Sequence, residues 1–434
     1  MPLRLSADAP EFEDAFAAFL AAKREVSEEV GAVVAEIVDD VRTCGDAAVL
    51  DYTRRFDALD LTATTMRVGP DEIAAARSQC DPEALRALTV AADRIAAFHE
   101  RLKPEDLDYA DADGVRLGVR WTAMESVGLY VPGGTAAYPS SVLMTAIPAR
   151  VASVPRIVMV APTPEGKVNP LVLAAAELAG VDEIYRIGGA QAVAALAYGT
   201  RTIAPVVKIV GPGNAYVAAA KRQVFGQVGI DMIAGPSEIL VVADNENDPD
   251  WIAADLLSQA EHDEAAQSIL IADDAGFADS VAAAVARQIA VLDRAEIAAA
   301  SWCDNGAIIL VAKLAEAVPL IDRIAPEHLA LSVADPDGLA KSVRNAGAIF
   351  LGRYAPEAIG DYVAGPNHVL PTARSARFSS GLGVTDFMKR STLIGCDAES
   401  LAAIGPSAIA LAKAEGLGAH AKSISIRLNA REHG

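Results

Sequence analysis

The chain has 434 residues, of which 37 are basic and 58 acidic, so its formal net charge is −21. This acidic balance argues against a nucleic-acid partner or an anionic membrane surface, because both require a basic face. The longest apolar runs are too short to span a bilayer and the N-terminus has no apolar signal core, so we expect a cytoplasmic protein. The 4 cysteines lie far apart, without a CxxC spacing, which favours reduced thiols over a disulfide framework or a thiolate metal site.

The first quarter of the chain is predicted to be helical. Apolar residues recur at three- and four-residue spacing in AFAAFLAAKREVSEEVGAVVAEIVDDVRT and again in Asp71–Arg101. That period is typical of amphipathic helices. This region contains no Gly-rich loop or dense polar cluster, so we assign it mainly to scaffold.

From about Trp121 onward, β-branched apolar runs alternate with Ala-rich stretches. The expected strands are Arg156–Ala161, Glu183–Ile187, Val206–Val210, Glu238–Val242, Ser268–Ile271, Ala307–Val311 and Ala348–Leu351. The expected helices between them are Pro170–Ala179, Ala190–Tyr198, Asp250–His262 and Phe277–Val291. This alternation predicts two successive α/β units with parallel sheets. After about Ser379 short helices return, Ser400–Lys413 being the clearest.

Glycine-rich turns follow three of the strand-like runs. They are YVPGGTAAY (Tyr130–Tyr138), IGGAQ (Ile187–Gln191) and VGPGNAY (Val210–Tyr216). Each could present backbone N–H groups to a dinucleotide, but none matches G-x-G-x-x-G, so the motifs alone give weak support to a Rossmann fold. A fourth turn, GPSE, places the Ser237 hydroxyl at the mouth of the next strand. We expect these turns at the carboxyl ends of strands, where open α/β sheets bind ligands.

Two polar motifs could carry chemistry. In LLSQAEHD, Gln259 and His262 are three apart on a helix and share a face, which suits either a metal half-site or helix capping. In APEHL, proline at an expected helix start precedes Glu327 and His328. That pair is either an acid/base couple or an ordinary first-turn Glu beside a surface His.

Two further motifs are loops with polar side chains. GDYVAGPNHVLPT carries Asp361 and His368, and GAHAK carries His420 among small residues. Loops of this kind hold functional residues or merely solvated ones. Of the remaining histidines, His99 is expected to be structural and His433 to lie in a terminal tail. From the residues alone the chain is an α/β enzyme with candidate metal and nucleotide sites, and a metallohydrolase fits almost as well.

Together these segments resemble the histidinol dehydrogenase family, from about Arg24 to Arg427. The most specific stretch is AKRQVFGQVGIDMIAGPSEILVVAD (Ala220–Asp244). The motifs LLSQAEHD, APEHL, GDYVAGPNHVLPT, FSSGLGVTDFMKRST and EGLGAHAKSI follow it in the order that the family shows. Several long motifs in the right order are far stronger evidence than any one of them.

The resemblance implies the site residues. One zinc ion per subunit would be bound by Gln259, His262, Asp361 and His420. Glu327 and His328 would be the catalytic pair. Ser237, Glu415, His328 and the zinc ligands would contact the substrate, and Tyr130, Gln191 and Asn214 would contact NAD.

The resemblance also implies the reaction, which is a four-electron oxidation of L-histidinol through histidinal to L-histidine with two NAD⁺, the last step of histidine biosynthesis. We assign His328 as the base for the alcohol and Glu327 as the group that activates water. Because no cysteine lies in a candidate motif, we expect water to attack the aldehyde directly. We expect the zinc to orient the substrate.

The expected architecture is an α/β homodimer with two incomplete Rossmann-like domains and smaller helical N- and C-terminal arm segments. We expect an N-terminal helical segment (1–30), an α/β domain carrying most of the zinc site (31–128 and 237–380), an NAD-binding domain (129–236) and a C-terminal dimerisation arm (381–434). His420 and Glu415 would complete the partner's active site.

Two alternatives remain at this point. A metallohydrolase would use zinc to activate water without NAD. A catalytically inactive zinc-binding or assembly protein is disfavoured, because Glu327 and His328 are both present.

Overall fold

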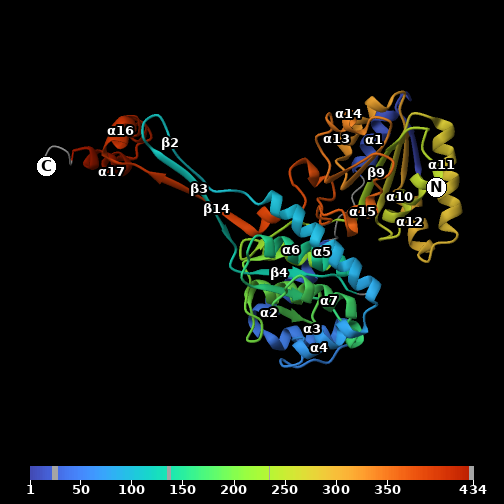
Figure 1. Ribbon diagram of the computed structural model, residues 1–434, viewed down its shortest axis with the longest axis horizontal. Coiled ribbons are helices and arrows are strands. Elements are labelled where there is room, and N and C mark those ends of the chain that lie inside the picture. Colours follow the sequence, from blue (N-terminus) through green and yellow to red (C-terminus); the bar gives the residue numbers. More distant parts are fainter. Residues whose placement is uncertain (22–27, 134–137, 234, 430–434) are drawn as a thin grey trace.

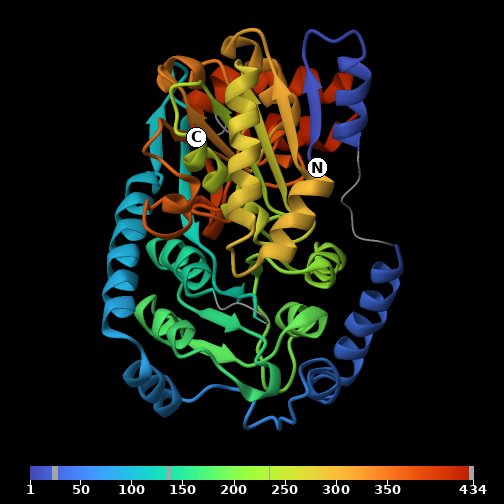
Figure 2. The ribbon, with the colours of Figure 1, turned by 90° about the vertical axis from the view of Figure 1, so that its right-hand side faces the viewer.

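The computed structural model describes residues 1–21, 28–133, 138–233 and 235–429. Figure 2 shows two α/β bodies one above the other, and Figure 1 shows an arm that projects away from both. Each body is built on a parallel sheet, and the arm is built on an antiparallel one. The expected fold class, α/β with Rossmann-like parallel sheets, is confirmed.

The first body contains a six-stranded parallel sheet in the order β1-β11-β10-β9-β12-β13. Its strands are β1 (Leu3–Ser6), β9 (Glu238–Ala243), β10 (Gln267–Ala272), β11 (Ala307–Leu310), β12 (His328–Ser332) and β13 (Ala348–Leu351). Every residue of β9 and β10 is buried, as expected for central strands covered on both faces. The chain steps from β9 to one edge and then returns to β12, so the strand order reverses between β9 and β12.

Helices cover both faces of this sheet. α10 (Pro249–Ala260), α11 (Ala275–Ile289) and α12 (Ala295–Asn305) pack on one face. α1 (Phe12–Ala21) and α13 (Ala317–Ile324) pack on the other. Two short helices, α14 (Pro336–Ala340) and α15 (Glu357–Tyr362), follow β12 and β13. The Asp248 side chain accepts a hydrogen bond from the Asp250 N–H and Pro249 occupies the first turn, which fixes the start of α10.

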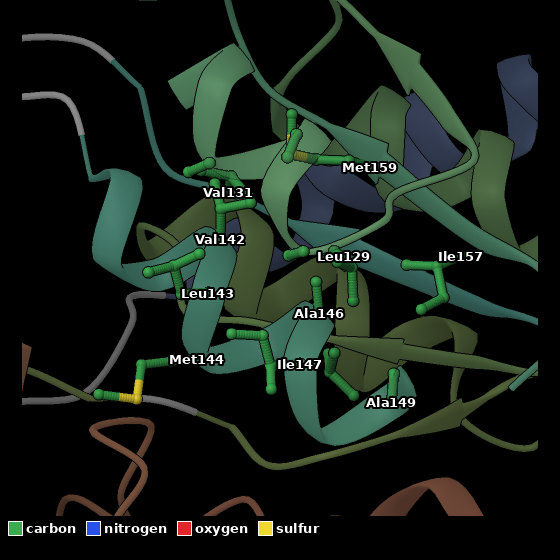
Figure 3. Close-up of a cluster of buried hydrophobic side chains, with 14 of the residues drawn as sticks. Leu129, Val131, Val142, Leu143, Met144, Ala146, Ile147, Ala149, Ile157 and Met159 are labelled. Atoms are coloured by element: carbon green, nitrogen blue, oxygen red, sulfur yellow. The ribbon is translucent and has the colours of Figure 1, made fainter. Parts of the chain in front are cut away.

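The second body contains a five-stranded parallel sheet in the order β6-β5-β4-β7-β8. Its strands are β4 (Val127–Tyr130), β5 (Ile157–Val160), β6 (Glu183–Tyr185), β7 (Lys208–Val210) and β8 (Gly229–Ile230). One face is covered by α4 (Pro70–Gln79), α5 (Pro82–Leu102), α6 (Pro139–Val151) and α7 (Pro170–Leu178). The other is covered by α2 (Glu28–Cys44), α3 (Asp46–Asp57), α8 (Gly189–Tyr198) and α9 (Ala215–Val224). Figure 3 shows Val142 and Ile147 of α6 lying over the strand residues Leu129 and Ile157.

The helices of residues 31–128 do not pack with residues 237–380 in one domain, in contrast to the expectation from the sequence. Helices α2 to α5 bury their apolar faces against the five-stranded sheet, in the second body. Residues 1–30 differ as well, because β1 pairs with β11 as an edge strand of the six-stranded sheet. Helical periodicity shows that a face is buried, but it carries no information about which sheet covers that face.

The arm is an antiparallel sheet that carries two helices at its tip (Figure 1). Its strands, in the order β14-β3-β2, are β2 (Leu107–Ala110), β3 (Arg116–Ala123) and β14 (Met388–Gly395). Pairing runs from Met388 opposite Ala123 to Gly395 opposite Arg116. The tip helices are α16 (Ala398–Ala414) and α17 (Gly418–Asn429). The arm therefore uses chain before β4 as well as the expected C-terminal segment.

Four single-turn 3₁₀ helices complete the described elements: η1 (Pro164–Gly166), η2 (Leu314–Glu316), η3 (Ser375–Arg377) and η4 (Val384–Phe387). Across the described ranges, no helix combines the length and apolar character needed to cross a membrane.

Candidate active site

The polar motifs of the first body meet where β9 and β12 begin. Ser237 precedes β9, and Glu327 precedes His328, the first residue of β12. Two features of the sequence analysis are corrected here. The APEHL motif opens a buried strand rather than a helix, because Ala325 ends α13 in the left-handed conformation. The Ser237 turn lies at the amino end of its strand rather than at a carboxyl end.

The backbone of Glu238 holds both members of the expected catalytic pair. Its N–H donates to Glu327 Oε2 at 2.9 Å, and its carbonyl oxygen lies 2.9 Å from His328 Nδ1. A carbonyl oxygen can only accept, so Nδ1 of His328 carries the proton and Nε2 keeps its lone pair. Burial lowers the pKa of His328 to about 4, which keeps the imidazole neutral near pH 7. The fold therefore presents Nε2 as a proton acceptor.

The Glu327 carboxyl group is also buried. Burial raises its pKa well above the ordinary value, and the nearby carboxylates of Glu238, Asp361 and Glu357 add to this, while the Glu238 N–H opposes it. A cation bound among these carboxylates would favour the ionised form. Glu327 is thus a carboxyl group whose proton occupancy depends on what binds beside it.

A cluster with metal-ligand chemistry adjoins this pair. Ligand atoms of His328, Glu357 and Asp361 all lie within 4.8 Å of one another. Glu357 accepts a hydrogen bond from the Ser258 hydroxyl at 2.9 Å, while its Oε1 has no hydrogen-bond partner in the described part of the chain. Burial raises the pKa of both Glu357 and Asp361. Two buried carboxyl groups this close hold their charge poorly unless a cation joins them.

Of the four expected zinc ligands, three come from elements that border this cluster. Gln259 lies in the last turn of α10 with 1% of its surface exposed, and its Oε1 finds no partner among the described residues. His262 lies just beyond the end of α10, where its backbone N–H donates to the Gln259 carbonyl oxygen at 3.1 Å. Asp361 is in α15. The unpaired oxygen of Gln259 is an acceptor of the kind that a cation would satisfy.

The fourth expected ligand, His420, lies elsewhere. It is an exposed residue of α17, and Glu415 is exposed at the end of α16. Both belong to the tip of the arm, which Figure 1 shows far from the body that contains β9 and β12. Within one chain, the structure therefore does not bring His420 or Glu415 to the cluster.

The expected cofactor residues meet in the second body. The strand order reverses between β4 and β7, and in open α/β sheets the crevice at the carboxyl ends of such neighbours binds ligands. Tyr130 ends β4, and its hydroxyl accepts a hydrogen bond from the Gly189 N–H at 3.0 Å. Gln191, in the first turn of α8, is buried, and its Oε1 lacks a partner within the described ranges. Asn214 caps α9 by accepting from the Tyr216 and Val217 N–H groups.

Three comparisons with known proteins agree on one family. The family model for histidinol dehydrogenase matches residues 20–428. A histidinol dehydrogenase of Rhodospirillum rubrum is 68% identical over 430 residues, 99% of each chain. One of Rhizobium meliloti is 66% identical over 434 residues, 100% of both chains. The crystal structure of histidinol dehydrogenase from Elizabethkingia anophelis matches with a TM-score of 0.95 at 35% identity, over 99% of each chain.

The chain belongs to the histidinol dehydrogenase family. The resemblance expected from its motifs is thereby confirmed, over nearly the range that those motifs indicated. The likeness to the Elizabethkingia histidinol dehydrogenase covers both bodies and the arm together, since it extends over 99% of the chain.

Glu357 was not identified from the sequence as a residue of the site. It is the first residue of α15, and Asp361 follows four positions later. Carboxylates four apart on one helix share a face, so the segment PEAIGD carried a usable signal. Glu357 lies just before the motif GDYVAGPNHVLPT, and α15 is too short to leave a clear helical period in the sequence.

His368, for which the sequence suggested no role, connects the two bodies. Its Nδ1 lies 3.0 Å from the carbonyl oxygen of Asp361, so this nitrogen donates and Nε2 must accept. The partner of Nε2 at 3.2 Å is the hydroxyl of Ser141 in α6. The loop that follows α15 thus binds both Asp361 of α15 and Ser141 of α6, the helix after β4.

Proposed function

We propose that this protein oxidises L-histidinol to L-histidine through histidinal, with two NAD⁺, as the last step of histidine biosynthesis. The observation that best supports this proposal is the tautomer of His328. Its Nδ1–H is bound to a backbone carbonyl and its Nε2 faces the carboxylate cluster, 3.7 Å from Glu357 Oε1. A neutral imidazole held in this way can accept the proton of a substrate alcohol.

The residues in and beside the cluster suit a zinc ion. Gln259, His262 and Asp361 offer oxygen and nitrogen donors, and a buried Gln259 oxygen without a partner among the described residues is otherwise costly. When bound, zinc supplies a fixed positive charge that orients the imidazole and amino nitrogens of the substrate. Ser237, beside Glu238, would contact the same substrate.

His328 and Glu327 each have a separate role in proton transfer. His328 Nε2 takes the hydroxyl proton as the first hydride leaves the carbinol carbon. Glu327, in its ionised form, takes a proton from the water that adds to the aldehyde, which gives the hydrate anion from which the second hydride leaves. Tyr130, Gln191 and Asn214 would hold NAD⁺, which would supply the hydride acceptor for both oxidations; the Oε1 of Gln191, without a partner among the described residues, would accept from a cofactor amide or hydroxyl.

A second copy of the chain would complete each site, in a homodimer. His420 as the fourth zinc ligand and Glu415 as partner of a cationic substrate group lie on an arm that leaves its own body. Large apolar side chains remain exposed at the arm's tip: Ile394, Leu411, Leu417 and Ile426. Such surfaces are normally covered by a partner. The exposed thiols of Cys44, Cys303 and Cys396 suit the reducing cytoplasm, where we place the reaction.

The test is the appearance of NADH when the zinc-loaded protein is mixed with NAD⁺ and L-histidinol. Two NADH should form per histidinol consumed, with histidine as the product. A metallohydrolase, or an inactive zinc-binding protein, would form none. Absence of NADH from demonstrably zinc-loaded dimer would overturn the proposal.

A further inference from the structure

A buried ion pair lies in the stretch Ala220–Asp244, the most family-specific part of the sequence, and the mechanism above makes no use of it. The side chains of Lys221 in α9 and Asp231 after β8 are 2% and 1% exposed, and they are paired directly. Both belong to the second body, at the end of the sheet where the cofactor turns gather. Burying two charges requires a compensating use of their hydrogen-bonding groups.

Both members of the ion pair form hydrogen bonds with the backbone of a single residue, Gly211. The Gly211 carbonyl oxygen accepts from Lys221 Nζ at 2.9 Å. The Gly211 N–H donates to Asp231 Oδ2 at 2.7 Å. The other carboxylate oxygen of Asp231 accepts from Lys221 and from the Met232 N–H. Every strong hydrogen-bonding group of the pair is therefore directed at the backbone or at its partner.

Gly211 occupies a conformation that needs such support. It is the first residue after β7, and its φ of +113° lies where only glycine is comfortable. A Cβ on Gly211 would lie 2.2 Å from the carbonyl oxygen of Tyr130, so the turn packs directly against the end of β4. The same turn ends at Asn214, the cap of α9. The orientation of the Gly211 peptide thus sets the position of Asn214 relative to Tyr130.

We propose that Lys221 and Asp231 are positioning residues for NAD⁺, which hold the Gly211–Asn214 turn in its cofactor-binding conformation. The proposal rests on the proposed function of that crevice. A buried ion pair replaced by apolar groups of similar size commonly folds as well or better, so stability alone does not call for these charges. The pair adds a donor and an acceptor at fixed places around Gly211, which apolar groups cannot supply.

The test is the double variant Lys221→Met with Asp231→Asn, which avoids leaving one charge buried alone. The KM and the Kd for NAD⁺ of the zinc-loaded enzyme should rise about tenfold or more, as expected when binding determinants are displaced rather than removed. The KM for histidinol and the zinc content should stay as in the wild type. A second double variant, Lys221→Gln with Asp231→Asn, restores a neutral N–H donor and should recover part of the NAD⁺ affinity.

Lys208→Met is a matched control. Lys208 is a buried lysine of β7, at the amino end of the strand, where its Nζ donates to the Asp386 carbonyl oxygen at 2.7 Å. The Lys208→Met variant removes a comparable buried charge from β7, the strand before the turn, without changing a contact of the turn. The KM for NAD⁺ should therefore stay as in the wild type. If the two Lys221 variants and the control bound NAD⁺ like the wild type, the positioning role would be wrong and the proposed function would stand. Wild-type protein that failed to bind NAD⁺ would overturn both.

Discussion

The position of His420 allows a sharp test of the shared active site. The eight residues of β14 alone span about 26 Å at about 3.3 Å per residue, and α16 and α17 lie beyond them. A zinc–nitrogen bond is about 2 Å long. An arm of this length, braced by pairing with β3, cannot fold back to place His420 on the cluster of its own chain. We therefore expect His420 to act in the partner's site.

The perturbation is a pair of single variants, His262→Ala and His420→Ala, each expected to be inactive alone. The two proteins are unfolded, mixed in equal amounts and refolded in the presence of zinc. In a mixed two-fold dimer with exchanged arms, one site carries both lesions and the other carries neither. Random pairing makes half of all dimers mixed, so roughly a quarter of wild-type sites should return.

NADH formation is the assay, and mass spectrometry of intact dimers verifies the mixing. A control sample of each variant, refolded by itself, sets the background. If His420 acted within its own chain, every site in every dimer would carry one lesion. Activity at background in verified mixed dimers would therefore refute the exchanged arm, while the zinc assignment would be unaffected.

Three further predictions follow from the site and its scaffold. Glu327→Gln should slow histidinal oxidation more than histidinol oxidation, and His328→Asn should slow the alcohol step, each by about 10²–10⁴, measured for the separate half-reactions by stopped flow. A chelator should abolish turnover while the far-ultraviolet circular dichroism stays unchanged, and added Zn²⁺ should restore activity. Burial lowers the pKa of His99 to about 4, and its ring nitrogens have no partner in the described chain. Between pH 6.5 and pH 4 the unfolded chain therefore protonates His99 while the folded chain keeps it neutral. The free energy of unfolding should therefore fall by up to about 3 kcal/mol between pH 6.5 and pH 4 in urea titrations, and His99→Met should remove that part of the slope.

The parallel strands and their helices could be predicted because burial on both faces leaves a strong mark on composition. The strand β5 is apolar throughout, β9 and β10 each end in an apolar run after one or two polar residues, and the helices between β5 and β9 are rich in alanine. The strand β2 could not be found in this way. All four of its residues are exposed, and its pairing with β3 depends on a contact that no local pattern encodes.

The candidate site was predictable to the extent that its residues lie in distinctive motifs. Gln259, His262 and Asp361 come from two separate segments, and only the family resemblance linked them into one expected site. Glu357 was not predicted because the sequence does not distinguish a buried carboxylate from an exposed one. The protonation state of His328 was equally inaccessible, since it depends on the carbonyl oxygen of Glu238, a backbone atom that every residue possesses.

In the proposed reaction, a substrate bound in the first body and a cofactor bound in the second have to meet at a fixed distance, although each proposed site lies on its own sheet. The structure joins the bodies beside both sites. Ser141, near the start of α6, donates to His368 Nε2, and the Asn367 side chain donates to the Met144 carbonyl oxygen in the same helix. His368 in turn binds the backbone of Asp361. Because α15 carries a candidate zinc ligand and the loop directly after it docks on the helix after β4, a shift of one body against the other would displace that ligand as well. The docking contacts therefore couple substrate orientation to cofactor position, which is what two successive oxidations at one carbon atom require.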